Sequence, residues 1–63
     1  MNLYCNQKKK MMSNFIVVEE INDALILDDG WVEYEFYPDT GQLFKFHDHT
    51  DRKTKLSGVW REM

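Results

Sequence analysis

The strongest constraint on the fold is an alternating segment that lies between two turn signals. From Trp31 to Tyr37, the side chains suited to a core occupy every second position, as they do on a half-buried β-strand. Asp29-Gly30 precedes this segment and Pro38–Gly41 follows it, and both stretches are rich in residues that favour turns. The pattern therefore predicts antiparallel strands joined by short hairpins.

The first hairpin is predicted to have a two-residue turn. Asp-Gly favours a type I′ turn, because both central residues of that turn need a positive φ. With Asp29-Gly30 as the turn, Leu27 pairs with Val32, and Leu25 pairs with Tyr34. The two leucines then join the apolar face of the alternating strand.

The second hairpin allows two kinds of register, which differ in the face that each side chain joins. A four-residue loop, Pro38–Gly41, is the direct reading of the turn residues. It would set Glu35 opposite Phe44 and so mix charged and apolar side chains on one face. A three-residue or a five-residue loop avoids this mixing.

We predict the five-residue loop, from Pro38 to Gln42, because proline lacks the N–H that a ladder position requires. This loop pairs Phe36 with Phe44. By the same spacing it pairs Tyr34 with Phe46, so that four aromatic rings share one face. The register also gives two cross-strand charge pairs, Glu35–Lys45 and Glu33–His47.

The remaining segments complete a small β domain. Residues 55–61 are predicted to form a closing strand, with Leu56 and Trp60 facing inward. Residues 14–23 favour a strand because of their β-branched run, with an N-terminal helix over 14–23 as the α+β alternative. The expected fold class is mainly β, a small antiparallel meander of four to five strands in a curled sheet or small barrel. The predicted core is Leu25, Leu27, Val32, Tyr34, Phe36, Phe44, Phe46, Leu56 and Trp60, with part of the Phe15–Val18 run.

Residues 1–13 show no periodicity, so we expect a flexible tail there and a single small β domain over residues 14–63. A chain of 63 residues has a thin core, which argues against a deep enzyme cleft. Cys5 is the only cysteine, and the apolar run at 15–18 is too short for an export signal or a membrane span. These features predict a cytoplasmic protein.

The formal net charge of −3 is unevenly distributed along the chain. Residues 11–44 contain acidic side chains but no Lys or Arg, whereas the basic residues lie in segments 1–10 and 45–63. Concentrated charge of one sign creates a long-range field that steers an oppositely charged partner. The sequence therefore predicts a partner with a basic surface.

The outward face of the predicted sheet is the candidate partner-binding surface. Trp31 and Tyr37 would lie opposite the core, and aromatic side chains of this kind are enriched among the residues that dominate binding energy. Acidic side chains would lie between and beside them. The predicted partner-binding residues are Trp31, Glu33, Glu35, Tyr37, Asp28, Asp29, Asp39 and Leu43.

His47 and His49 are the candidates for metal binding, with Glu33 as a third ligand. Residues two apart on a strand point to the same face, so both imidazoles could approach one ion. The simpler interpretation is a pair of surface histidines beside acidic neighbours, because two ligands without a defined third are little evidence for a site. We therefore expect no metal, no cofactor and no catalytic residue.

The function expected from these features is a small acidic, non-enzymatic protein-binding module. Its size and charge are typical of an inhibitory or regulatory accessory protein, such as a phage-encoded protein that acts on a basic or nucleic-acid-binding host protein. The alternative is a small β-barrel that binds single-stranded nucleic acid through aromatic and basic side chains. A homodimeric structural protein is the third hypothesis, and no membrane partner is expected.

Overall fold

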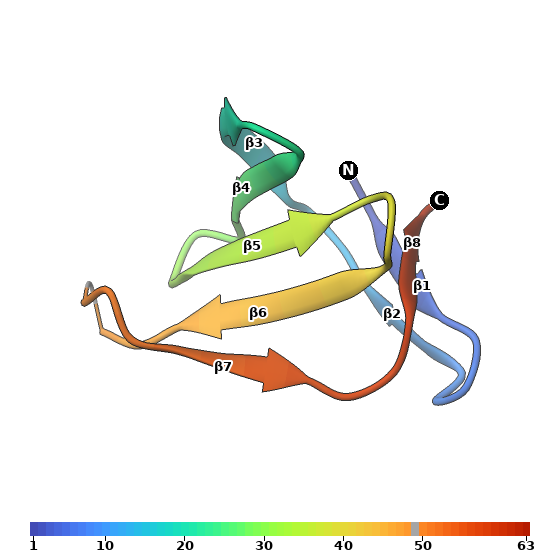
Figure 1. Ribbon diagram of the computed structural model, residues 1–63. Coiled ribbons are helices and arrows are strands. Elements are labelled where there is room, and N and C mark those ends of the chain that lie inside the picture. Colours follow the sequence, from blue (N-terminus) through green and yellow to red (C-terminus); the bar gives the residue numbers. More distant parts are fainter. Residues whose placement is uncertain (49) are drawn as a thin grey trace.

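The computed structural model describes residues 1–48 and 50–63, which form eight β-strands and no helix (Figure 1). The strands are β1 (Leu3–Cys5), β2 (Lys10–Met12), β3 (Ile16–Ile21), β4 (Ala24–Asp28), β5 (Glu33–Tyr37), β6 (Gln42–Phe46), β7 (Lys53–Leu56) and β8 (Trp60–Glu62). They make a five-stranded sheet, in the order β3-β4-β5-β6-β7, and a three-stranded sheet, in the order β2-β1-β8. Within the described residues, no helix has the length and apolar character needed to cross a membrane.

The five-stranded sheet confirms the expected antiparallel meander, because each strand pairs with the next one along the chain. β3 and β7 form its two edges, so the sheet is open and does not close into a barrel. Residues 16–21 form the predicted strand, and the helical alternative over 14–23 is wrong. The expected closing strand over 55–61 is divided, because Gly58, with a φ of 94°, lies between β7 and β8.

The prediction of a flexible tail over residues 1–13 is wrong. β1 is the central strand of the three-stranded sheet, between β2 and the C-terminal β8. Leu3 and Cys5 are fully buried, and the amino group of Met1 donates a hydrogen bond of 3.0 Å to the Phe15 carbonyl. Local periodicity could not reveal this strand, because β1 has three residues and its partner β8 lies at the far end of the chain.

The first hairpin, between β4 and β5, has a four-residue loop instead of the predicted type I′ turn. Each strand partner is displaced by two residues, so that Leu27 pairs with Tyr34. The wider loop is held by Asp29, whose Oδ1 accepts hydrogen bonds from the amides of Trp31 (2.9 Å) and Val32 (3.0 Å). A displacement of two residues keeps the side chains of β4 and β5 on their predicted faces.

The second hairpin, between β5 and β6, adopts the four-residue register that the hydrophobic pattern disfavoured. Glu35 pairs with Phe44, and Tyr34 pairs with Lys45. This displacement of one residue moves Phe44 and Phe46 to the face opposite Tyr34. The predicted pairs Phe36–Phe44, Tyr34–Phe46, Glu35–Lys45 and Glu33–His47 therefore do not form.

Gly41 and Leu43 account for this register. Gly41 has a φ of 79°, and its carbonyl accepts a 2.8 Å hydrogen bond from the Trp60 amide, which joins the hairpin to β8. A Cβ at this position would lie 2.9 Å from the Trp60 carbonyl oxygen, so no side chain fits there. Leu43, paired with Phe36, is fully buried and takes the core position predicted for Phe44.

The core lies between the three-stranded sheet and one face of the five-stranded sheet, which we call the inner face. Its buried members are Leu3, Cys5, Phe15, Leu27, Tyr34, Phe36, Leu43 and Trp60. Among the predicted core residues, burial is confirmed for Leu27, Tyr34, Phe36 and Trp60. Leu25, Val32 and Leu56 are partly buried and pack against this core. The main omissions of the sequence-based core are therefore β1 and Leu43.

Candidate functional site

The opposite face of the five-stranded sheet, the outer face, carries three adjacent rows of side chains with different chemistry. Residues two apart on a strand, and partners across strands, point to the same face. The observed registers therefore set acidic side chains on β5 beside aromatic ones on β6 and basic ones on β7. The three rows are Glu33 and Glu35, Phe44 and Phe46, and Lys53 and Lys55.

One part of the outer face is occupied by its own contacts. Lys53 Nζ lies 2.6 Å from Glu35 Oε1 and 4.7 Å from the centre of the Phe44 ring. The hydrogen bond to Glu35 raises the pKa of the Lys53 ammonium. The Tyr37 ring meets the Phe44 ring edge-to-face, with 5.9 Å between centroids. Glu35 and Tyr37, both predicted to contact a partner, thus contact Lys53 and Phe44 of the same chain.

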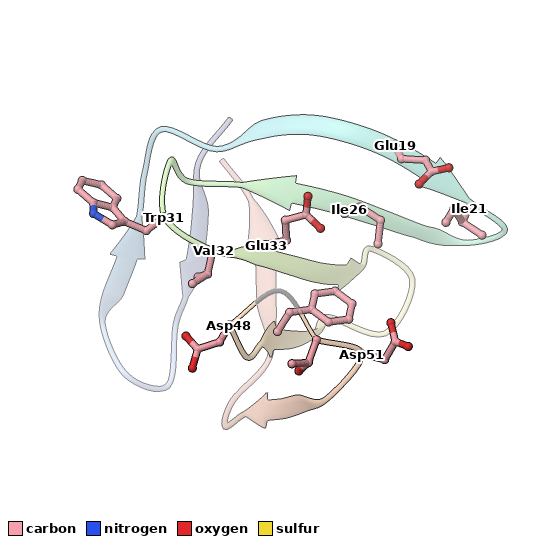
Figure 2. A pocket seen from close by; sticks show the side chains of 10 residues that line it. Glu19, Ile21, Ile26, Trp31, Val32, Glu33, Asp48 and Asp51 are labelled. Carbon is pink, nitrogen blue, oxygen red and sulfur yellow. The ribbon is translucent and has the colours of Figure 1, made fainter.

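A groove of about 440 Å³ lies on the outer face beside this ion pair, between β3 and the loop that joins β6 to β7 (Figure 2). Its apolar floor consists of Ile21, Ile26, Val32 and Phe46. Its rim carries the four carboxylates of Glu19, Glu33, Asp48 and Asp51, together with Thr50. No Lys or Arg lines it among the residues that the structure describes. We call this site the acidic groove.

Trp31 lies at one end of the acidic groove and is 84% exposed. Its backbone is fixed although its ring is free, since its amide donates to Asp29 in the β4–β5 loop. The exposure of Trp31 agrees with its predicted outward position. An exposed indole on a hydrogen-bonded loop can contact a second molecule with little loss of backbone entropy.

Asp28 and Asp29, predicted to bind a partner, hold this loop. Asp28 Oδ1 accepts a 2.7 Å hydrogen bond from the Gly30 amide. Partial burial raises the pKa of Asp29, but hydrogen bonds from the amides of Val32 and Trp31 outweigh it, and the pKa lies below its usual value. Burial, together with the Asp29 charge, raises the pKa of Tyr34. An ionised Asp29 therefore stabilises the loop that presents Trp31.

The other predicted contact residues lie outside the acidic groove. Leu43 is fully buried, so its prediction as an exposed contact residue is wrong, because the register turns it inward. Asp39 is exposed in the β5–β6 loop, at the other end of β5 from Glu33. Of the predicted set, Trp31 and Glu33 are therefore the residues that line the groove.

The proposed metal ligands are not brought together. His47 Nε2 lies 2.5 Å from Thr54 Oγ1 on β7, and Glu33 pairs with Asp28 of β4 rather than with His47. His49 lies outside the described residues. Among the residues described, no group of three His, Cys, Asp or Glu side chains is placed to hold a metal ion.

Sequence reasoning missed most of the groove. Phe46 was expected in the core, whereas it lines the groove. Ile26 was not among the predicted partner-binding residues. It faces the groove because its neighbours Leu25 and Leu27 face inward. Asp48 and Asp51 come from a loop whose position depends on the β6 register. The available signal was that both aspartates lie within the short turn segment that follows the aromatic strand, but using it required the correct register of that strand.

Comparison with protein families, with curated proteins and with solved structures finds no match to this chain.

Proposed function

We propose that this chain is a small, non-enzymatic protein-binding module that docks a basic surface of another protein in the acidic groove. In this role it acts as an inhibitory or regulatory accessory protein. The observation that carries the proposal is the combination of an apolar floor with four rim carboxylates and no described basic lining residue. This combination suits lysine and arginine side chains, whose apolar stems can cover the floor while their charged ends meet the rim.

The parts of the groove have different roles in such binding. Exposed carboxylates mainly accelerate association and select against acidic partners, and salt weakens their effect. Phe46 and Trp31 offer apolar area that leaves water on binding, which contributes most to the lifetime of a complex. We therefore expect the rim to control the association rate and the aromatic side chains to control dissociation.

Single-stranded nucleic acid remains the alternative ligand, because Phe44 and Phe46 lie beside Lys53 and Lys55 on the outer face. Two contacts make this face less suitable for stacking bases. The Lys53 side chain already covers the Phe44 ring, and the Phe46 ring lies in a groove whose rim repels phosphate. We therefore favour a basic protein.

The test uses two variants with the same change in net charge. Glu33→Gln/Asp51→Asn neutralises two of the four rim carboxylates, and Asp39→Asn/Glu62→Gln neutralises two carboxylates outside the groove. Each protein is immobilised and challenged with nuclease-treated and untreated host lysate, and bound proteins are eluted with salt. We expect the wild type and the control variant to retain the same basic protein after nuclease, and the groove variant to lose it. Capture that requires intact nucleic acid, or that is equal for both variants, would contradict the proposal.

A further inference from the structure

β3 is an edge strand whose surface is unusually apolar. It pairs with β4 on one side only, and all six of its residues are exposed. Ile16 is 69% exposed, Val18 is 53% exposed, and Val17 and Ile21 are also exposed. Figure 1 shows β3 at the end of the sheet farthest from β7. Its outward backbone groups can therefore pair with another extended segment.

The other edge of the same sheet is protected. β7 carries Lys53 and Lys55, and lysine on an edge strand discourages pairing with a further strand. β3 has no basic residue, and its charged residues are Glu19 and Glu20. A bulge interrupts its pairing with β4 between Val17 and Glu19, and the pairing is regular from Glu19 to Ile21. The lysines of β7 repel a basic strand, whereas the glutamates of β3 attract one, so β3 is the edge that suits a basic strand.

Charge identifies the occupant of this edge. If a second copy of β3 paired antiparallel about the strand centre, Glu19 would lie opposite Val18 and Glu20 opposite Val17. Glu19 of each chain would then lie diagonally across from Glu20 of the other chain on the same face, and like charges at neighbouring cross-strand positions repel. A strand with lysine or arginine at adjacent central positions would instead place one cation beside each glutamate. Charge complementarity therefore favours a basic partner over a second copy of this chain.

The acidic groove is continuous with this edge. Glu19 and Ile21 of β3 pair with outer-face residues of β4, and both line the groove. Side chains of an added strand would alternate, so every second one would lie on the groove side next to Glu19, and the others would lie beside Glu20. Strand addition would therefore deliver basic side chains to the groove.

We propose that β3 accepts an extended basic segment of the partner as a sixth strand of the sheet. This inference rests on the proposed function, because it specifies how the basic partner is presented to the groove. Backbone hydrogen bonds along β3 supply affinity that does not depend on sequence, while Glu19, Glu20 and the groove rim select basic side chains.

The probe is a capped eight-residue peptide with two central lysines flanked by valine and threonine. Two further peptides have the same charge. One carries backbone N-methyl groups at its odd positions and the other at its even positions. Because successive N–H groups of a strand point to opposite edges, each methylated peptide has one edge that cannot donate hydrogen bonds. We expect the parent peptide to slow amide hydrogen exchange in Ile16–Ile21. One methylated peptide should bind about tenfold or more weakly because it loses several hydrogen bonds, and the other should bind like the parent.

Equal binding of all three peptides would overturn strand addition. The groove proposal would then stand if Glu33→Gln/Asp51→Asn still weakened binding, so the two failures are distinguishable. Protection of β3 amides that grows with protein concentration and without peptide would show a second copy at this edge and would also overturn the inference.

Two variants test the charge argument. Glu19→Lys/Glu20→Lys should abolish binding of the parent peptide, whereas Asp39→Lys/Glu62→Lys, with the same change in net charge, should retain most of it at moderate salt. Equal loss in both variants would mean that overall charge alone attracts the peptide, and the inference would be wrong.

Discussion

The two faces of the five-stranded sheet differ in how their aromatic side chains are used. On the inner face, Phe36 is 1% exposed and Tyr34 is 4% exposed, and both pack beneath the three-stranded sheet. On the outer face, Phe44 and Phe46 are only half-buried, beneath a lysine or in a groove. Aromatic content alone therefore does not identify a core, and in a small sheet the same residue type can serve stability on one face and recognition on the other.

Phe36→Ala should give the largest loss of stability and would sharpen this comparison most. Truncating a fully buried phenylalanine costs about 3–5 kcal/mol, which approaches the total stability of a small domain. We expect the variant to be largely unfolded by circular dichroism, or to have a much lower urea midpoint. A loss no larger than that of Phe44→Ala would mean that the faces are wrongly assigned.

Phe44→Ala should cost about 1–2 kcal/mol, because the ring is half-buried and loses its contacts with Tyr37 and Lys53. Urea unfolding measures this loss. Phe46→Ala is the matched control from the same face: it should reduce the affinity of the acidic groove for its partner, whereas Phe44→Ala should leave that affinity nearly unchanged. Equal effects on partner binding would show that the groove is not a distinct site.

The two hairpins explain which parts of the fold could be predicted from the sequence. The strand positions and the meander could be predicted from the alternation of apolar residues and from the turn residues. In the first hairpin the strand side chains lie on their predicted faces, although the observed loop is two residues longer than the predicted one. The predicted register of the second hairpin was wrong by one residue, and this error placed Phe44 and Phe46 on the wrong face of the sheet. Maximising aromatic residues on one face was misleading because Leu43, a smaller side chain, fills the space beside Phe36.

The acidic groove could be predicted only in its parts. Trp31, Glu33 and the excess of acidic residues are visible in the sequence, but bringing Glu19, Phe46 and Asp51 together depends on pairing between distant segments. The three-stranded sheet is hidden for the same reason, since it joins the first and last strands of the chain. Short strands carry too little local pattern to reveal such partners.

Asp29→Asn should change how stability depends on pH, because the Asp29 carboxylate accepts the hydrogen bonds that hold the β4–β5 loop, which carries the exposed Trp31. The pKa of Asp29 in the folded protein is below the usual value of an aspartate, so the unfolded state binds more protons as pH falls through this range. Its contribution to stability is therefore present at neutral pH and is lost on acidification from about pH 5 downward. Urea midpoints of the wild type and the variant should differ at pH 7, and the difference should be smaller at pH 3 and continue to shrink at lower pH. Asp39→Asn, in the other hairpin, is the matched carboxylate control, and a constant difference for Asp29→Asn at both pH values would contradict this role.

The ion pair between Lys53 and Glu35 should give the smallest effect, although its N–O distance is only 2.6 Å. The lysine side chain is 38% exposed and the glutamate is 16% exposed, so water and salt screen most of their attraction. A double-mutant cycle with Lys53→Met and Glu35→Gln should give a coupling energy of about 0.5–1 kcal/mol that decreases in 1 M salt. Lys55→Met, on the same strand and face, should show no coupling to Glu35. A coupling above about 2 kcal/mol would mean that the part of the outer face around Lys53 and Glu35 is held as firmly as the core. Of the outer face, only the acidic groove would then differ from a packed face.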